Sequence, residues 1–141
     1  MNRTFVMIKP DAVRRKLIGK IITRFEESGL TIIAMDFKKL SKELAQKHYE
    51  EHEGKDFYSN LISFVTSGYS VPMIIEGDDV VALVRKLIGA TDPAKAEPGT
   101  IRGDFKENPV KSVTENMVHA SDSDESAKRE ITLFFGSEFW N

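Results

Sequence analysis

The sequence contains no cysteine, so it forms no disulfide, offers no thiolate nucleophile and has no ligands for a cysteine-based zinc site. Its N-terminal segment lacks a long apolar run, since only Phe5 to Ile8 precede Lys9, too few residues for a signal peptide or a membrane span. The formal net charge of −2 excludes a globally basic nucleic-acid binder but leaves room for local basic sites. We therefore expect a soluble, cytoplasmic protein with no membrane segment and no specific nucleic-acid partner.

The length of the chain, 141 residues, is typical of one domain and allows most of the apolar surface to be buried without covalent cross-links. The sequence shows neither an internal repeat nor a segment with the composition of a linker. We predict that residues 1–141 form a single domain.

Hydrophobic periodicity alternates between the patterns of strands and helices. It predicts strands over residues 5–8, 30–40, 71–76 and 117–118, and helices over residues 18–28, 42–53, 57–67, 80–88 and from 123 onward. Pro72 is expected at a strand start or on an edge strand, because proline donates no hydrogen bond to a neighbouring strand. This order predicts an α/β (α+β) sandwich with helices over a small mixed sheet, and the ferredoxin-like βαββαβ core is the leading candidate.

A long segment without periodicity, residues 89–115, lies before the last predicted strand. Loops of this length are usually functional or disordered. Ile101 and Phe105 interrupt its polar composition with apolar side chains that can anchor it. We expect an ordered loop whose functional residue is Arg102.

His119 follows a short apolar run and precedes a segment rich in N-cap residues and acids. It is thus expected at a strand end, where functional residues are common. Glu130 shares the apolar stripe of Ala127 and Ile131 in the next helix, so its carboxylate should face inward and need a partner. We predict that Glu130 accepts the proton of one ring nitrogen of His119, which leaves the other as a nucleophile. The alternatives are a histidine bonded to a carbonyl group and a glutamate at the stripe's edge.

Two further basic residues, Lys9 and Arg85, have predicted positions that suit a functional site. Lys9 ends the first predicted strand, although a lysine that merely begins a loop fits that stretch equally well. Arg85 lies at the margin of the apolar stripe of residues 80–88, from which its guanidinium can reach a cleft.

Two other classes of function remain as alternatives. His48 to His52 match the zinc-peptidase pattern H-x-x-E-H, but both histidines lie in a strongly charged segment, which favours a solvated helix face. A catalytic zinc would also need a third ligand from another element, so we assign no metal ligand. A ferredoxin-like module for single-stranded nucleic acid is disfavoured by the missing RNP1 pattern and the net charge.

Three groups of motifs resemble nucleoside diphosphate kinase: residues 6–11 (VMIKPD), residues 90–93 (ATDP) with 98–105 (PGTIRGDF), and residues 116–123 (NMVHASDS). The resemblance covers essentially the whole chain in the family's order, and the last two groups are highly specific. It implies a ferredoxin-like fold, a homo-oligomer that is a hexamer or tetramer built from dimers, and Mg²⁺ that enters with the nucleotide. It also implies that the γ-phosphate of a nucleoside triphosphate moves to His119 and then to a nucleoside diphosphate.

The resemblance also implies a role for each matching residue. His119 resembles the phosphorylated nucleophile, oriented by Glu130, with Ser121 hydrogen-bonding nearby and Tyr49 shaping the phosphate pocket. The remaining residues resemble nucleotide ligands: Lys9, Arg85, Thr91 and Arg102 for the phosphates, Asn116 for a sugar hydroxyl, and Phe57 for stacking on the base. Since every base offers a ring face, whereas the hydrogen-bonding edges differ, we expect broad base specificity. No Walker loop is present, so side chains must hold the phosphates.

The sequence departs from the family pattern at three places. A few more residues than usual separate Arg102 from Asn116, which bears on loop contacts and subunit packing. Ala120 replaces the commoner glycine, a change that we expect the backbone to tolerate. Tyr69-Ser70 replaces the usual apolar pair.

Overall fold

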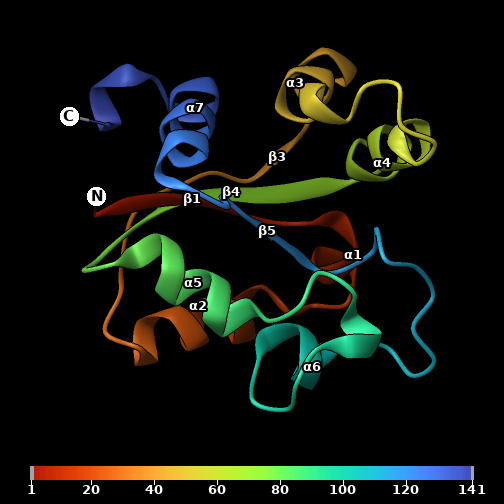
Figure 1. Cartoon of the computed structure of the whole chain (residues 1–141), viewed down its shortest axis with the longest axis horizontal. Coiled ribbons are helices and arrows are strands. Elements are labelled where there is room, and N and C mark those ends of the chain that lie inside the picture. The colour runs from red at the N-terminus through yellow and green to blue at the C-terminus, as the bar shows by residue number, and fades with distance from the viewer. Residues whose placement is uncertain (1, 141) are drawn as a thin grey trace.

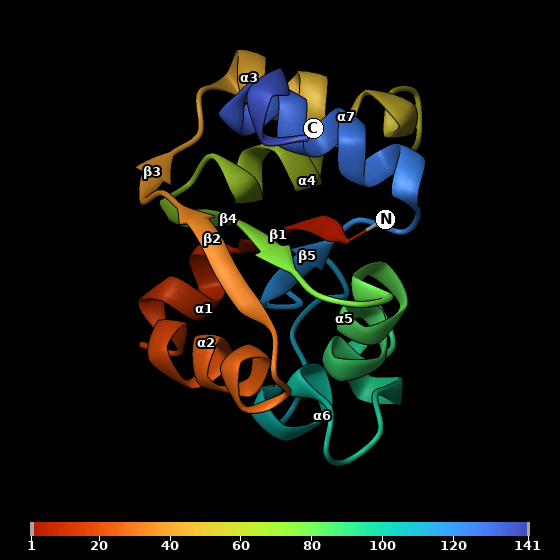
Figure 2. The same cartoon turned by 90° about the vertical axis from the view of Figure 1, so that its left-hand side faces the viewer.

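The computed structural model describes residues 2–140, so residues 1 and 141 of the predicted domain lie outside the described part. A sheet lies between two layers of helices (Figures 1 and 2). The strands are β1 (Arg3–Ile8), β2 (Thr31–Met35), β3 (Lys38–Lys39), β4 (Tyr69–Glu76) and β5 (Val118–Ala120). The α-helices are α1 (Pro10–Arg14), α2 (Ile18–Glu27), α3 (Lys42–His48), α4 (Tyr58–Val65), α5 (Val80–Ile88), α6 (Ile101–Phe105) and α7 (Asp124–Phe135). The 3-10 helices in the described part of the chain are η1 (Glu50–His52), η2 (Pro93–Lys95) and η3 (Ser137–Phe139).

The sheet has the order β2-β4-β1-β5, and β3 pairs with β4 beyond the end of β2. Every pairing is antiparallel. The predicted ferredoxin-like fold is confirmed, whereas the prediction of a mixed sheet was wrong. None of the helices within residues 2–140 has the length and apolar character that crossing a membrane requires.

Successive side chains of β1 point to opposite faces of the sheet, and a hydrophobic core lies on each face. Val6 and Ile8 point into the core beneath α1, α2, α5 and α6, whereas Phe5 and Met7 point into the core beneath α3, α4 and α7. All four side chains are fully buried, as a central strand with helices on both faces requires. His119 pairs with Met7 in register, so it lies on the same face as α3 and α7.

The region predicted as one strand over residues 30–40 forms two strands, because Asp36 and Phe37 interrupt it. Pro72 lies opposite this interruption, inside the central strand β4, so its predicted place at a strand start or edge was wrong. Its carbonyl group accepts a hydrogen bond from Asp36 N at 2.9 Å, so its nitrogen faces the same side. Proline has no N–H group to donate to the neighbouring strand. The sheet tolerates Pro72 because the neighbouring strand is interrupted opposite it, where that N–H group would otherwise be needed.

The helix predicted over residues 42–53 was too long. Ser41 caps it as expected, accepting a hydrogen bond from Leu44 N at 3.0 Å, but α3 ends at His48. Ala45 and His48 share the buried face of α3, so His48 is only 2% exposed. The prediction that His48 lies on a solvated helix face was therefore wrong, because the burial of this face outweighs the charge of the segment.

Other predicted elements agree with the structure more closely. The helix predicted over residues 18–28 is α2, which is followed by Gly29 with a φ of 82°, a conformation that favours glycine. The long segment over residues 89–115 holds two short helices, η2 and α6, between irregular stretches. Thr100 caps α6 through a hydrogen bond from Gly103 N at 3.0 Å, which presents Arg102 from the first turn.

Candidate active site

One cleft of about 520 Å³ brings together predicted site residues from segments that are far apart in the sequence. All except Ser121 line it: Lys9, Tyr49, Phe57, Arg85, Thr91, Arg102, Asn116, His119 and Glu130. Ser121 is buried directly behind the cleft. The sequence therefore identified a set of residues that the fold brings together.

The contact predicted between His119 and Glu130 is present at the wall of this cleft. Nε2 of His119 lies 2.7 Å from Oε1 of Glu130, and the hydroxyl of Ser121 donates to the same oxygen at 2.8 Å. Glu130 is only 3% exposed, because it shares the inward face of α7 with Ala127 and Ile131. No residue within 2–140 hydrogen-bonds Nδ1 of His119. When Nε2 carries the proton toward Glu130, Nδ1 keeps a free lone pair.

The strand that carries His119 is held in place by the first helix. Lys9 N donates to Met117 O at 2.8 Å, and Met117 N donates to Oδ2 of Asp11 at 3.1 Å. These bonds fix Met117 in the left-handed region with a φ of 73°, just before β5 begins. Asp11 was not among the predicted site residues, since no pattern shows that its carboxylate reaches a residue so distant in sequence.

Two cations, Lys9 and Arg102, are buried in the cleft, and the charge of Asp11 only partly offsets the effects that lower their pKa values. Burial, followed by the charge of Arg102, lowers the pKa of Lys9 to about 8. Burial, followed by the charge of Arg85, lowers the pKa of Arg102 to about 10. Within residues 2–140, neither cation lies within 4 Å of a carboxylate oxygen. An anion in the cleft would therefore meet positive charge that the Asp11 carboxylate offsets only in part.

Arg102 also supports the fold, which the sequence did not predict. Its guanidinium donates to the carbonyl groups of Asn116 at 3.1 Å, Gly89 at 3.0 Å and Val118. Arg85, in contrast, is largely exposed and makes one long bond to the carbonyl group of Ala120 at 3.3 Å. The two arginines thus differ in how much local structure depends on them.

Polar groups beside the cations remain available for a ligand. The side chain of Asn116 donates to Thr91 O at 3.2 Å, while its Oδ1 is buried without a partner. The hydroxyl of Tyr49 is likewise buried and unpaired. Burial, with the charge of Glu130, raises the pKa of Tyr49, so the phenol stays protonated and can donate a hydrogen bond.

Phe57 lies at the mouth of the cleft and is 44% exposed. It precedes the first turn of α4, and its ring contacts His52, whose centroid is 5.3 Å away. An exposed aromatic ring that is supported from one side offers its free surface to a planar ligand.

The residue that sequence reasoning missed most clearly is His48. Its ring meets that of His119 edge-on, with 4.6 Å between centroids, and also contacts Phe5 and Tyr49. Burial, followed by the charge of His119, lowers the pKa of His48 well below its usual value, which keeps its ring neutral. The spacing of His48 from Ala45 on α3 was the signal that could have indicated its burial.

The H-x-x-E-H pattern does not form the metal pair of a zinc peptidase. His48 ends α3, whereas His52 lies in η1, so the two histidines do not share one turn of a continuous helix. The metal-ligand groups that lie close together within residues 2–140 include His48 but not His52. The structure therefore does not support the zinc-peptidase alternative.

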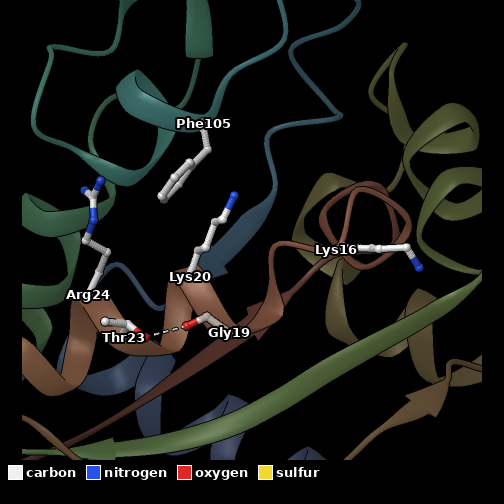
Figure 3. Close-up of a pocket in the computed structure, with 6 residues that line it drawn as sticks. All are labelled: Lys16, Gly19, Lys20, Thr23, Arg24 and Phe105. Atoms are coloured by element: carbon white, nitrogen blue, oxygen red, sulfur yellow. Dashed lines mark hydrogen bonds between the residues drawn. The ribbon is translucent and has the colours of Figure 1, made fainter.

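A second hollow, of about 470 Å³, lies between α2 and α6 (Figure 3). Lys20, Arg24 and Phe105 surround it, while Lys16 points away from them. Arg24 pairs with Asp104 at 2.8 Å and stacks on Phe105, 4.7 Å from the ring centre. Because Arg24 is paired with Asp104 and none of the predicted site residues lines this hollow, it is not the predicted reactive site.

Comparisons with known proteins agree with this fold and cleft. A model of the family "Nucleoside diphosphate kinase" matches residues 2–139. A nucleoside diphosphate kinase from Methanocaldococcus jannaschii is 59% identical over 134 residues, which cover 95% of this chain and 93% of the relative. One from Sulfurisphaera tokodaii is 56% identical over 138 residues, which cover 98% of this chain and 91% of the relative.

Two solved structures are also similar. A nucleoside diphosphate kinase from Halobacterium salinarum in complex with CDP has a TM-score of 0.91 and 46% identity, covering 98% of this chain and 90% of its own. The apo enzyme from Encephalitozoon cuniculi has a TM-score of 0.90 and 43% identity, covering 96% of this chain and 90% of its own. By sequence and by structure, this chain belongs to the nucleoside diphosphate kinase family, enzymes that transfer phosphate between nucleotides.

Proposed function

We propose that this enzyme moves the γ-phosphate of a nucleoside triphosphate to a nucleoside diphosphate through a phosphohistidine at His119. The observation that carries the proposal is the 2.7 Å contact of Nε2 with Glu130, which directs the free lone pair to Nδ1. Nδ1 attacks the γ-phosphorus, and the bond from phosphorus to the β–γ bridging oxygen breaks, releasing the diphosphate. A terminal oxygen of the second diphosphate then attacks the phosphohistidine, and Nδ1 leaves with its lone pair.

In this proposal the cations of the cleft hold the phosphates in line. Lys9, Arg85 and Arg102 come from three different elements, and their charges meet at one cleft. Phosphoryl transfer requires positioning and neutralisation of charge more than covalent help from the protein. Thr91 and the phenol of Tyr49 add neutral donors, and the unpaired Oδ1 of Asn116 accepts from a sugar hydroxyl.

The residues of the cleft fit Mg²⁺ that arrives with the nucleotide. Most polar groups around the cleft are cations or neutral donors, which cannot form an all-protein magnesium cage. Glu51 and Asp122 are the exposed carboxylates on the lining. Asp122 follows His119 closely in sequence, and the hydrogen bond that it accepts from Ser126 lowers its pKa, so it stays ionised. Mg²⁺ typically binds through one or two carboxylates, water and the substrate phosphates, where it neutralises charge. Asp122 would be its protein ligand.

We further propose that residues 1–141 act as a single domain within a cytoplasmic homo-oligomer, a hexamer or a tetramer. Support comes from the outer strand β2 and the adjoining β3. Met35 and Phe37 are more than half exposed there, and Phe37 stacks on Tyr69 with 4.7 Å between ring centres. An outer strand with exposed apolar side chains favours association with another chain.

The phosphohistidine is tested by mixing the protein with ATP and Mg²⁺ and measuring its intact mass. We expect one added phosphate that is labile in acid and that transfers to GDP added afterwards. Steady-state kinetics should give parallel double-reciprocal lines, as a covalent intermediate shared by two half-reactions requires. Intersecting lines together with no adduct would refute the covalent route.

Broad base specificity predicts a uniform effect of Phe57→Ala. Stacking contributes about 1–3 kcal/mol per base, so the substitution should raise Kd by roughly 5- to 150-fold, at about 1.4 kcal/mol per factor of ten. The measurement is Kd for ADP, GDP, CDP and UDP, alongside thermal melts. Because Phe57 is 44% exposed, we expect little change in Tm. A loss confined to one base would show that a base edge is read elsewhere and would end the claim of broad specificity.

The lowered pKa of Lys9 predicts how nucleotide affinity depends on pH. With a pKa of about 8 in the free protein, the charged form of Lys9 falls from most to few of the molecules between pH 7 and 9. If only the charged form binds phosphate well, Kd for ADP should rise by roughly 10-fold over this range. Lys9→Gln should bind weakly at every pH and lose this dependence. A wild-type Kd that stays constant up to pH 9 would show that Lys9 does not hold the phosphates.

A further inference from the structure

His48 is a buried group that none of the steps above uses. It is 2% exposed, and neither of its ring nitrogens has a hydrogen-bond partner among residues 2–140. Leaving such a polar group buried and unpaired destabilises the folded protein, and packing alone does not explain why the protein tolerates this. The phenyl rings of Phe5 and Phe134, which contact it, cannot accept its proton in a conventional hydrogen bond.

The unpaired ring lies in a cluster of metal-binding groups. His48, His119 and Glu130 each offer one ligand atom, and these three atoms lie within 4.8 Å of one another. His119 comes from the strand β5, and the other two residues come from α3 and α7, which cover the face of the sheet on which His119 lies (Figure 1). His119 and Glu130 also line the cleft, so an ion can reach the cluster from there.

We propose that His48, His119 and Glu130 bind a transition-metal ion such as Zn²⁺ in the nucleotide-free protein, and that the bound ion stops His119 from accepting phosphate. Binding of the ion does not depend on the reaction proposed above. Its inhibitory effect rests on the proposed role of His119 as the nucleophile.

The donor set selects the kind of ion. Two imidazoles and a carboxylate are the protein ligands of one type of catalytic zinc site, which keeps a fourth position open. Imidazole suits Zn²⁺, Cu²⁺ and Ni²⁺, whereas Mg²⁺ prefers oxygen ligands. The Mg²⁺ that accompanies the nucleotide should therefore not compete for this cluster.

Small movements of the side chains complete the site. Zinc–ligand distances of about 2.0–2.2 Å in a tetrahedral site place neighbouring ligand atoms roughly 3.4 Å apart. The 2.7 Å contact between His119 and Glu130 must therefore lengthen, and any separation near the 4.8 Å limit of the cluster must shorten by up to about 1.4 Å. The ion enters between His119 and Glu130 and gives the ring of His48 a partner.

The chemistry of the imidazole ring explains why the ion would inhibit. If the metal takes Nδ1 of His119, it uses the lone pair that attacks phosphorus. If the metal takes Nε2, the proton of the neutral ring resides on Nδ1, which then has no lone pair. Both modes of binding remove the nucleophile, and removal of the metal restores it.

Binding is tested by titrating Zn²⁺ into nucleotide-free protein in a buffer without phosphate or chelator. We expect one ion per chain. His48→Phe, which keeps a ring but removes both nitrogens, should raise Kd for Zn²⁺ by at least roughly 10- to 100-fold, the loss caused even by removing an outer partner of a ligand. The matched control is His52→Phe, which alters the other histidine of the same sequence pattern and should keep the wild-type Kd. Equal losses in the two variants, or none in His48→Phe, would overturn the site.

Glu130→Gln provides a second variant, because it removes the carboxylate while keeping the shape of the side chain. It keeps the test decisive if His48→Phe fails to fold, which thermal melts will show. We expect weaker Zn²⁺ binding in Glu130→Gln, and unchanged binding would count against the cluster. Millimolar Mg²⁺ should not displace the ion from wild-type protein, and displacement would contradict the assigned donor chemistry.

Inhibition is tested by loading the protein with one equivalent of Zn²⁺, removing unbound metal by gel filtration and then adding ATP with Mg²⁺. Intact mass should show far less phosphorylated protein than a metal-free sample at the same time. Phosphorylation should return after a chelator strips the zinc and Mg²⁺ is replenished. Normal phosphorylation of loaded protein would overturn the inhibition. If the metal-free sample is also not phosphorylated, the proposed reaction fails, while the Zn²⁺ titrations still decide the site.

Discussion

His119→Ala should abolish both half-reactions, leaving no phosphorylated protein after incubation with ATP and no transfer to a diphosphate. The reason is that Nδ1 of His119 is the nucleophile of the first step and the leaving group of the second. The fold should survive, because the His119 ring packs at the wall of a cleft and is partly exposed. Rapid-quench phosphorylation and steady-state turnover measure the two steps, and a melt confirms the fold. Any phosphorylated protein in this variant would assign the nucleophile to another residue.

Substitution of Glu130, the partner of His119, should slow the phosphorylation of His119 without abolishing it. Glu130→Gln keeps an acceptor oxygen near Nε2 but removes the charge that stabilises the ring as its lone pair is used. We expect the phosphorylated protein to form with a rate constant lower by roughly 100-fold, at the lower end of what proton-handling groups contribute. Ser121→Ala is the matched comparison, since it removes the 2.8 Å bond to the same oxygen but leaves the carboxylate. Its loss should be smaller, and a larger one would contradict the central role of Glu130.

Arg85→Ala and Arg102→Ala should each lower kcat by roughly 10²-fold or more, because both cations act mainly in the transition state. That factor corresponds to about 2.7 kcal/mol of transition-state stabilisation. Lysine should rescue little at either position, since ammonium is a point charge and cannot span two phosphate oxygens. Turnover by Arg102→Lys at nearly the wild-type rate would refute the positioning argument.

The same two variants should differ in stability. Arg102 donates to three backbone carbonyl groups, of which that of Asn116 also accepts from Val118 N at 2.9 Å. Arg102→Ala should therefore lower Tm, at about 1–3 kcal/mol for each carbonyl group that is left buried without a partner. Arg85 makes a single long bond, so Arg85→Ala should melt close to the wild type. Arg85→Ala therefore isolates the effect on catalysis. A large loss of Tm in Arg85→Ala with normal Tm in Arg102→Ala would contradict these structural roles.

The sequence alone determined the elements whose burial follows a strict period. The apolar run of β1 and the stripe of α7 made the first strand and the inward direction of Glu130 predictable. Ser41 and Ser123 marked helix starts because a serine side chain satisfies a free backbone N–H locally. The residues of the cleft were identifiable because their motifs resemble those of one family.

Tertiary structure alone decided what depends on contacts between distant segments. Pro72 fits a central strand because a neighbouring strand breaks beside it, and the sequence of either strand alone does not show this. Arg102 reaches carbonyl groups on both sides of its loop, so its structural role needs the folded chain. His48 looked solvated among charged neighbours, yet α3 packs its face against His119. Burial depends on what covers a residue, and the covering residues lie far away in the sequence.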